Sequence, residues 1–214
     1  MKDLPPTPTR FLNLVSNMST KTQPLEKIAL FGGITAVVVE WTALFLFYIN
    51  APVNYYGLPP LNLSYFATLP ETRYIFATSL SIAAISFWVF VKWHLSKKLE
   101  TPIELFTLSM FAYLILACTP FDPTNAFSHN LHKVIAFVFT VTFIWGMFLL
   151  GKNNAHTALR TFSYLTASLA TFLSITMFAL TDQSLFFMLE LLVGFICQIW
   201  IIGVTLYTFK IRSH

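Results

Sequence analysis

The chain consists of long apolar runs separated by shorter polar stretches. Each run holds roughly 20 mostly apolar residues, the length that an α-helix needs to cross the hydrocarbon core of a bilayer. The runs are apolar throughout, whereas the strands of a membrane barrel are about 10 residues of alternating polarity. The pattern therefore predicts an all-α integral membrane protein, a bundle of six transmembrane helices at about 28–50, 72–94, 103–119, 130–150, 158–180 and 184–209.

The composition agrees with this class of protein. Of the 214 residues, 56% are hydrophobic and only 10% are charged, and the mean hydropathy is +0.68. A water-soluble domain has about a quarter of its residues charged. Outside the membrane domain, 28–209, we expect a polar, disordered cytoplasmic tail over 1–27 and a short cytoplasmic tail over 210–214.

The basic residues predict the orientation in the membrane. In a six-helix arrangement, 11 of the 13 Lys and Arg fall on one side: Lys2, Arg10, Lys21, Lys27, Lys92, Lys97, Lys98, Lys152, Arg160, Lys210 and Arg212. Only Arg73 and Lys133 fall on the other side. Because cytoplasmic loops carry an excess of Lys and Arg, both termini are predicted to be cytoplasmic. The net charge of +4 follows from this topology and gives no reason to expect a nucleic-acid partner.

The junction between the third and fourth runs is polar and bracketed by prolines. It carries Asp122, His129, His132 and Lys133 in a chain that is otherwise poor in charge. On a helix, His132 and Lys133 lie one turn after His129 and share its face. Glu190 lies about two turns into the last run from the same side of the membrane. These side chains are therefore expected at similar depths in the outer leaflet.

Glu40 is predicted to lie near the middle of the bilayer, about twelve residues into the first run. An ionisable residue at that depth costs roughly 2.5–3.5 kcal/mol on insertion scales, so it should face the bundle interior and have a partner there. Two interpretations stay open. Glu40 either packs as a protonated carboxyl hydrogen-bonded to a neighbouring helix, or it joins the polar site of the outer leaflet from below.

The polar set itself has three interpretations. His129, His132 and Asp122 are side chains of the kind that bind zinc, and zinc with an open position activates water against the ester or amide of a lipid. In that enzyme, a metal-dependent lipid hydrolase or an acyltransferase-like protein, a His is base or metal ligand and a carboxylate such as Glu190 orients it. Alternatively, the same groups and Lys133 bind a lipid headgroup without chemistry. In the third interpretation they only satisfy helix ends.

Two cofactors fit the pattern poorly, and one further function stays open. The axial histidines of a bis-His haem face each other inside a bundle, whereas all five histidines fall near the ends of the runs. A retinal protein needs a Lys within a late helix, and Lys210 lies at the cytoplasmic end of the last one. A proton-coupled transporter remains an alternative, because Glu40 and Glu190 can carry protons.

Three short motifs give the chain a family resemblance. Ser64 precedes the segment Pro70-Glu71-Thr-Arg-Tyr-Ile-Phe76, Pro120-Phe-Asp122 precedes a His that opens the fourth run, and Glu190 lies in the last run. In this order they resemble the six-helix family of damage-regulated autophagy modulators (DRAM), fibroblast-growth-factor-receptor-activating proteins and post-GPI-attachment proteins. Related prokaryotic six-helix proteins of unknown function share the Pro-x-Asp and His junction.

The resemblance implies lipid-related work: remodelling of GPI lipids, control of phospholipid asymmetry, or modulation of membrane trafficking. It also marks Ser64 and Glu71 as ligand or packing positions. We therefore expect a multi-pass membrane protein that recognises or remodels a lipid at the exoplasmic leaflet through a His/carboxylate site. The alternatives are a non-enzymatic scaffold or regulator that binds a protein partner or forms a homo-oligomer, and the proton-coupled transporter.

Overall fold

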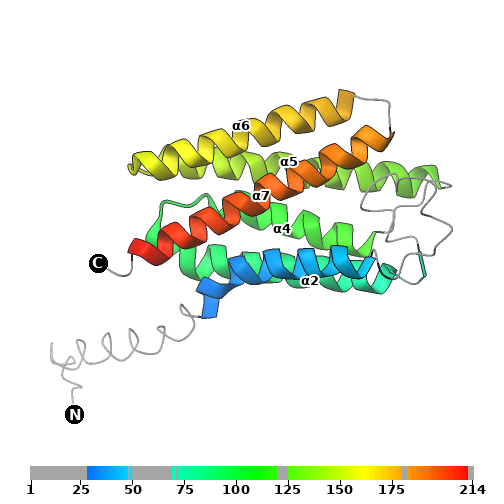
Figure 1. Ribbon diagram of the computed structural model, residues 1–214, viewed down its shortest axis with the longest axis horizontal. Coiled ribbons are helices and arrows are strands. Elements are labelled where there is room, and N and C mark those ends of the chain that lie inside the picture. Colours follow the sequence, from blue (N-terminus) through cyan, green and yellow to red (C-terminus); the bar gives the residue numbers. More distant parts are fainter. Residues whose placement is uncertain are drawn as a thin grey trace, which may run out of the picture.

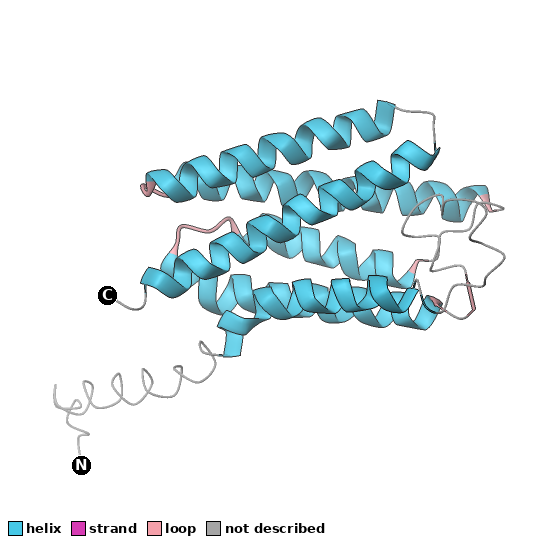
Figure 2. Cartoon of the chain, viewed as in Figure 1, coloured by secondary structure: helices cyan, strands magenta, loops and turns pink. Residues whose placement is uncertain are grey.

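A computed structural model describes residues 28–47, 49, 69–70, 72–119, 125–179 and 183–211, and all regular structure within them is helical (Figure 2). The elements are a first helix over Ile28–Phe47, α2 (Arg73–Val89), the π-helical segment η3 (Phe90–Leu95), α3 (Ser96–Lys98), α4 (Ile103–Cys118), α5 (Ala126–Asn153), α6 (Thr157–Ala179) and α7 (Gln183–Ile211). The all-α class is confirmed. The tail expected over 1–27 lies outside the described residues.

Five helical spans in the described part of the chain are long and apolar enough to cross a membrane. They are Ile28–Phe47, Arg73–Lys98, Ala126–Asn153, Thr157–Ala179 and Met188–Lys210. The remaining long helix, α4, is apolar but has only 16 residues. At 1.5 Å per residue it is about 24 Å long, which is less than the roughly 30 Å of the hydrocarbon core. By length and composition the chain is a multi-pass membrane protein.

The long helices lie side by side as one bundle (Figure 1). Helix α4 packs against α2 and α5, and α6 packs against α5 and α7. The first helix sits close to both α2 and α7 at two adjacent glycines. A Cβ atom on Gly32 would overlap the carbonyl oxygen of Ser86 in α2, and one on Gly33 would lie 2.6 Å from Thr205 Oγ1 in α7. Only glycine permits this approach, as is common where membrane helices cross closely.

The centre of the bundle is aromatic. Phe87, Phe106, Phe143 and Trp200 come from α2, α4, α5 and α7, and all are buried. Their neighbouring ring centroids lie between 5.4 and 5.8 Å apart. Trp200 Nε1 also donates a hydrogen bond to Ser163 Oγ of α6, at 3.0 Å. Five long helices thus meet in one buried cluster, while large apolar side chains of the kind that contact lipid cover the outside.

Candidate functional site

The carboxyl group of Glu40 joins the first helix to two other helices. Tyr113 Oη of α4 donates to Glu40 Oε1 at 2.8 Å, and Gln198 Nε2 of α7 donates to Glu40 Oε2. Gln198 lies near the middle of the apolar span Met188–Lys210, and its side chain is only 8% exposed. Glu40 therefore faces the bundle interior and has partners there, as its depth in the sequence predicted.

The groups around Glu40 are neutral or acidic. Its hydrogen-bond donors are a phenol and an amide, and in the part of the chain that the structure describes no Lys, Arg or His bonds to its carboxyl group. Cys197 lies within electrostatic range of Glu40, and Glu190 lies within range of Tyr113. The sequence places Glu190 level with the histidines, and in the structure it is also close enough to Tyr113 for the two to interact electrostatically.

Tyr113 holds its position by packing on α5. Its ring stacks on Phe139, with centroids 4.6 Å apart and planes inclined by 18°. An offset or stacked aromatic pair of this kind is worth about 0.5–1.5 kcal/mol beyond its buried area. The hydroxyl that reaches Glu40 is thus aimed by a rigid ring, and four helices contribute to the network.

The predicted histidines lie where α5 begins. Asn125 is the N-cap of α5, and its side chain accepts hydrogen bonds from the backbone N–H groups of Phe127 and Ser128. His132 is buried, with Nδ1 3.0 Å from the carbonyl oxygen of Thr119 at the end of α4. Because a carbonyl only accepts, His132 Nδ1 carries the proton. This histidine ties two helix ends together, one of the roles that the sequence left open.

The predicted zinc site stays a prediction. Among the residues that the structure describes, no group of three or more His, Cys, Asp or Glu side chains is placed to hold a metal ion. His129 is half-buried one turn before His132, but Asp122, the third proposed ligand, lies outside the described residues. Ser64 and Glu71, marked by the family resemblance, also lie outside them.

A second buried polar contact lies toward the opposite end of the bundle, and sequence reasoning missed it. His94, in η3, is fully buried, and its Nε2 lies 3.1 Å from Thr208 Oγ1 of α7. Thr208 Oγ1 donates its single proton to the carbonyl oxygen of Thr205, at 2.9 Å. His94 Nε2 must therefore be the donor to Thr208. A π-helical turn often marks a functional position, but helical spacing in the sequence gives no sign of this one.

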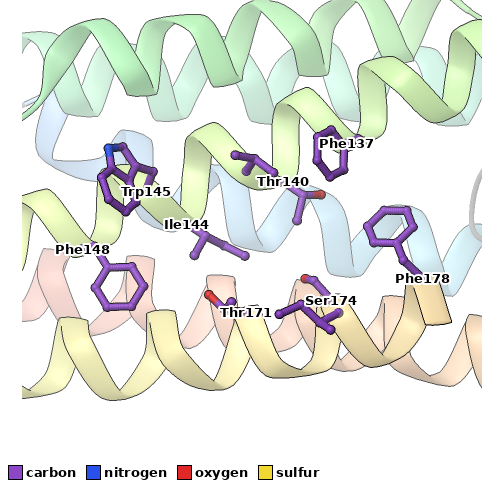
Figure 3. A pocket seen from close by; sticks show the side chains of 10 residues that line it. Phe137, Thr140, Ile144, Trp145, Phe148, Thr171, Ser174 and Phe178 are labelled. Carbon is purple, nitrogen blue, oxygen red and sulfur yellow. The ribbon is translucent and has the colours of Figure 1, made fainter.

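Two apolar grooves open on the outside of the bundle. One, between α5 and α6, has a volume of about 250 Å³, and the side chains of Ile144, Thr171 and Ser174 line it (Figure 3). The other lies between the first helix and α2 and has a volume of about 450 Å³. Its lining begins at Tyr74 in the first turn of α2 and runs down to Ile82.

A cationic side chain stands where the groove between the first helix and α2 begins. Arg73 Nη2 donates to Tyr74 Oη at 2.7 Å, and the guanidinium carbon lies 4.6 Å from the centroid of the same ring. Both side chains are exposed. The tyrosine thus holds the guanidinium next to the groove that it lines, with further donors of that guanidinium able to reach an anion.

No protein-family model, curated protein or solved structure matches the chain.

Proposed function

We propose that the protein is a six-span membrane protein with cytoplasmic termini that recognises an anionic lipid of the exoplasmic leaflet. The observation that carries the proposal is Arg73 beside the apolar groove. The groove can take an acyl chain between the first helix and α2, and the guanidinium can bind the phosphate of the same lipid. The two features lie at adjacent positions on α2, as a headgroup and its chain require.

The position of the helix ends supports a headgroup site at this level. Helices α2 and α5 begin at the same end of the bundle (Figure 1), so Arg73 at the start of α2 lies at the same end as His129 and Lys133 in the first turns of α5. Helix α5 has 28 residues, which at 1.5 Å per residue is about 42 Å. Because this exceeds the roughly 30 Å hydrocarbon core, α5 extends past the core, and we propose that its polar first turns, with His129 and Lys133, are the part in the headgroup region.

The experiment measures lipid bound by the detergent-purified protein after incubation with equal amounts of phosphatidylglycerol and phosphatidylcholine. Native mass spectrometry counts each lipid. Arg73→Gln is compared with Arg160→Gln, which removes an exposed cation at the start of α6, at the opposite end of the bundle. One cation near a membrane surface is worth about 1 kcal/mol, so Arg73→Gln should lower the phosphatidylglycerol-to-phosphatidylcholine ratio about fivefold. Equal ratios in the two variants contradict the proposal.

A second pair of variants tests the groove separately from the charge. Thr78→Trp places an indole among the side chains that line the groove, and Ile85→Trp places one on the exposed face of α2 outside that lining. Thr78→Trp should reduce binding of both lipids together, whereas Ile85→Trp should leave it unchanged. Unaltered lipid binding by Thr78→Trp would remove the groove from the proposal.

A further inference from the structure

We infer that Glu40 is a proton-binding site inside the bundle, and that the amide of Gln198 turns when the proton binds. The inference is independent of the lipid site, which lies at another depth and on the outside of the helices. It rests on the hydrogen-bond arrangement around one carboxyl group, on an unused buried acceptor beside it, and on the charges of the surrounding helices.

The arrangement in the structure is that of an ionised carboxylate. Both oxygens of Glu40 accept hydrogen bonds, from Tyr113 and from Gln198. A protonated carboxyl group must itself donate from one oxygen. With an N–H group facing Oε2, a proton on Oε2 has no acceptor on Gln198 unless the amide reorients, whereas a proton on Oε1 would require Tyr113 Oη to accept it and to give up its own donation to Glu40.

The acceptor for such a proton is already next to the site. Gln198 Oε1 is buried and makes no hydrogen bond in the part of the chain that the structure describes. A buried polar atom without a partner is destabilising, so its presence calls for an explanation. A half-turn of the amide exchanges Nε2 and Oε1. The oxygen then faces Glu40 Oε2 and accepts its proton, while Tyr113 continues to donate to Oε1 of the carboxyl group.

The proton balance of this step is simple. A proton from hydronium in the surrounding water, which is left as a water molecule, adds to Glu40 Oε2 and forms an O–H bond. The hydrogen bond from Gln198 Nε2 to the carboxylate is broken, and one from the carboxyl O–H to Gln198 Oε1 replaces it. The carboxyl group becomes neutral, and no other bond changes. Glu190, within electrostatic range of Tyr113, lies toward the end of α7 where that helix begins.

In the described parts of the surrounding helices, no positively charged side chain lies close enough to neutralise the Glu40 carboxylate. The titratable groups that face the site are Tyr113 on α4 and Cys197 and Glu190 on α7. In α2 the titratable side chains lie only in its first turn, and α5 has none between Lys133 and Lys152. Those of α6, Arg160 and Tyr164, lie in its first turns. A proton therefore neutralises Glu40 where a charge at the membrane centre is costly.

The test is infrared difference spectroscopy of the full-length protein in nanodiscs, recorded as the pH is lowered. A protonated carboxyl group shows a C=O stretching band that a carboxylate lacks. The wild-type protein should gain a band on acidification that Glu40→Gln lacks and that Glu190→Gln retains. A band that persists in Glu40→Gln, or a wild-type protein without any such band, overturns the inference.

Two further measurements complete the test. The first uses a milder variant, in case Glu40→Gln does not fold, and the second asks whether the site binds a metal cation instead of a proton. Tyr113→Phe keeps the ring that stacks on Phe139 but removes one hydrogen bond to the Glu40 carboxyl group. Its carboxyl band should therefore remain and move to higher frequency; an unmoved band assigns the signal elsewhere and overturns the inference. If instead sodium chloride, but not choline chloride, suppresses the wild-type band at constant pH, the site binds sodium, and a site selective for protons is refuted.

Discussion

Adding one methyl group at Gly146 should destabilise the bundle, because the glycine lies against a ring that cannot move away. A Cβ atom there would lie 2.7, 2.9 and 3.1 Å from three atoms of the Phe106 ring. Ordinary contact begins near 3.4 Å, so the ring would have to move by about 0.7 Å. Phe87, Phe143 and Trp200 surround that ring at centroid distances of 5.6–5.8 Å and hold it in place.

The expected magnitude follows from two opposing terms. Overpacking of a core costs about 1–3 kcal/mol, whereas replacing a glycine inside a helix by alanine gains roughly 0.5–1 kcal/mol. Gly194→Ala is the matched control. Its Cβ would meet nothing within 4 Å, and it gains the same helix stability from the replacement of glycine by alanine. Gly146→Ala should therefore be about 1–3 kcal/mol less stable than Gly194→Ala.

Thermal unfolding in detergent, followed by circular dichroism, measures this difference. For a chain of this size 1 kcal/mol corresponds to about 2–4 °C in Tm, so the two variants should differ by roughly 2–12 °C. If Gly146→Ala unfolds at the same temperature as Gly194→Ala or above it, the ring is not held by its neighbours, and the account of the aromatic core is wrong.

Three further substitutions test other contacts. Trp200→Phe removes the N–H group that bonds Ser163 and should cost about 1–3 kcal/mol of stability in the same unfolding assay, because both side chains are fully buried. Trp145→Phe, at a side chain that is 56% exposed, should change stability by less than about 0.5 kcal/mol, and a larger loss would contradict its lipid-facing position. Asn154→Ala removes the acceptor of the Glu100 amide proton, so hydrogen–deuterium exchange at Glu100 should become at least about threefold faster; unchanged exchange would contradict that bond.

The helical class and the inward orientation of Glu40 could be predicted because both follow from local properties. Run length and hydropathy define membrane helices, and the cost of a charge in lipid requires Glu40 to find a partner. The partners themselves, Tyr113 and Gln198, are 73 and 158 residues away in the chain. Helices that are apolar on every side have no polar face to show which side points inward, so the pairing depends on packing.

The contact of His94 could not be predicted from the sequence either, and here the reason lies at a helix end. Its position among Lys92, Lys97 and Lys98 indicates an exposed membrane boundary, and the predicted second span ends at that residue. In the structure the helix continues through the π-helical turn η3, and the wider turn sets His94 against Thr208. Side-chain spacing that assumes a regular α-helix does not describe such a turn.

Because Glu40 and Gln198 are far apart in the sequence, Glu40 is synthesised well before the amide that bonds it. The first helix leaves the ribosome 158 residues before its amide partner, and at about 5–20 residues per second this interval lasts roughly 8–30 s. During that time the newly inserted helix sits in lipid with an acidic side chain whose final contacts have not yet been made. A chain that stops before α7 can still form the Tyr113 bond to Glu40 but lacks the amide donor to Oε2, so the carboxyl group is completed only when the last helix has been made.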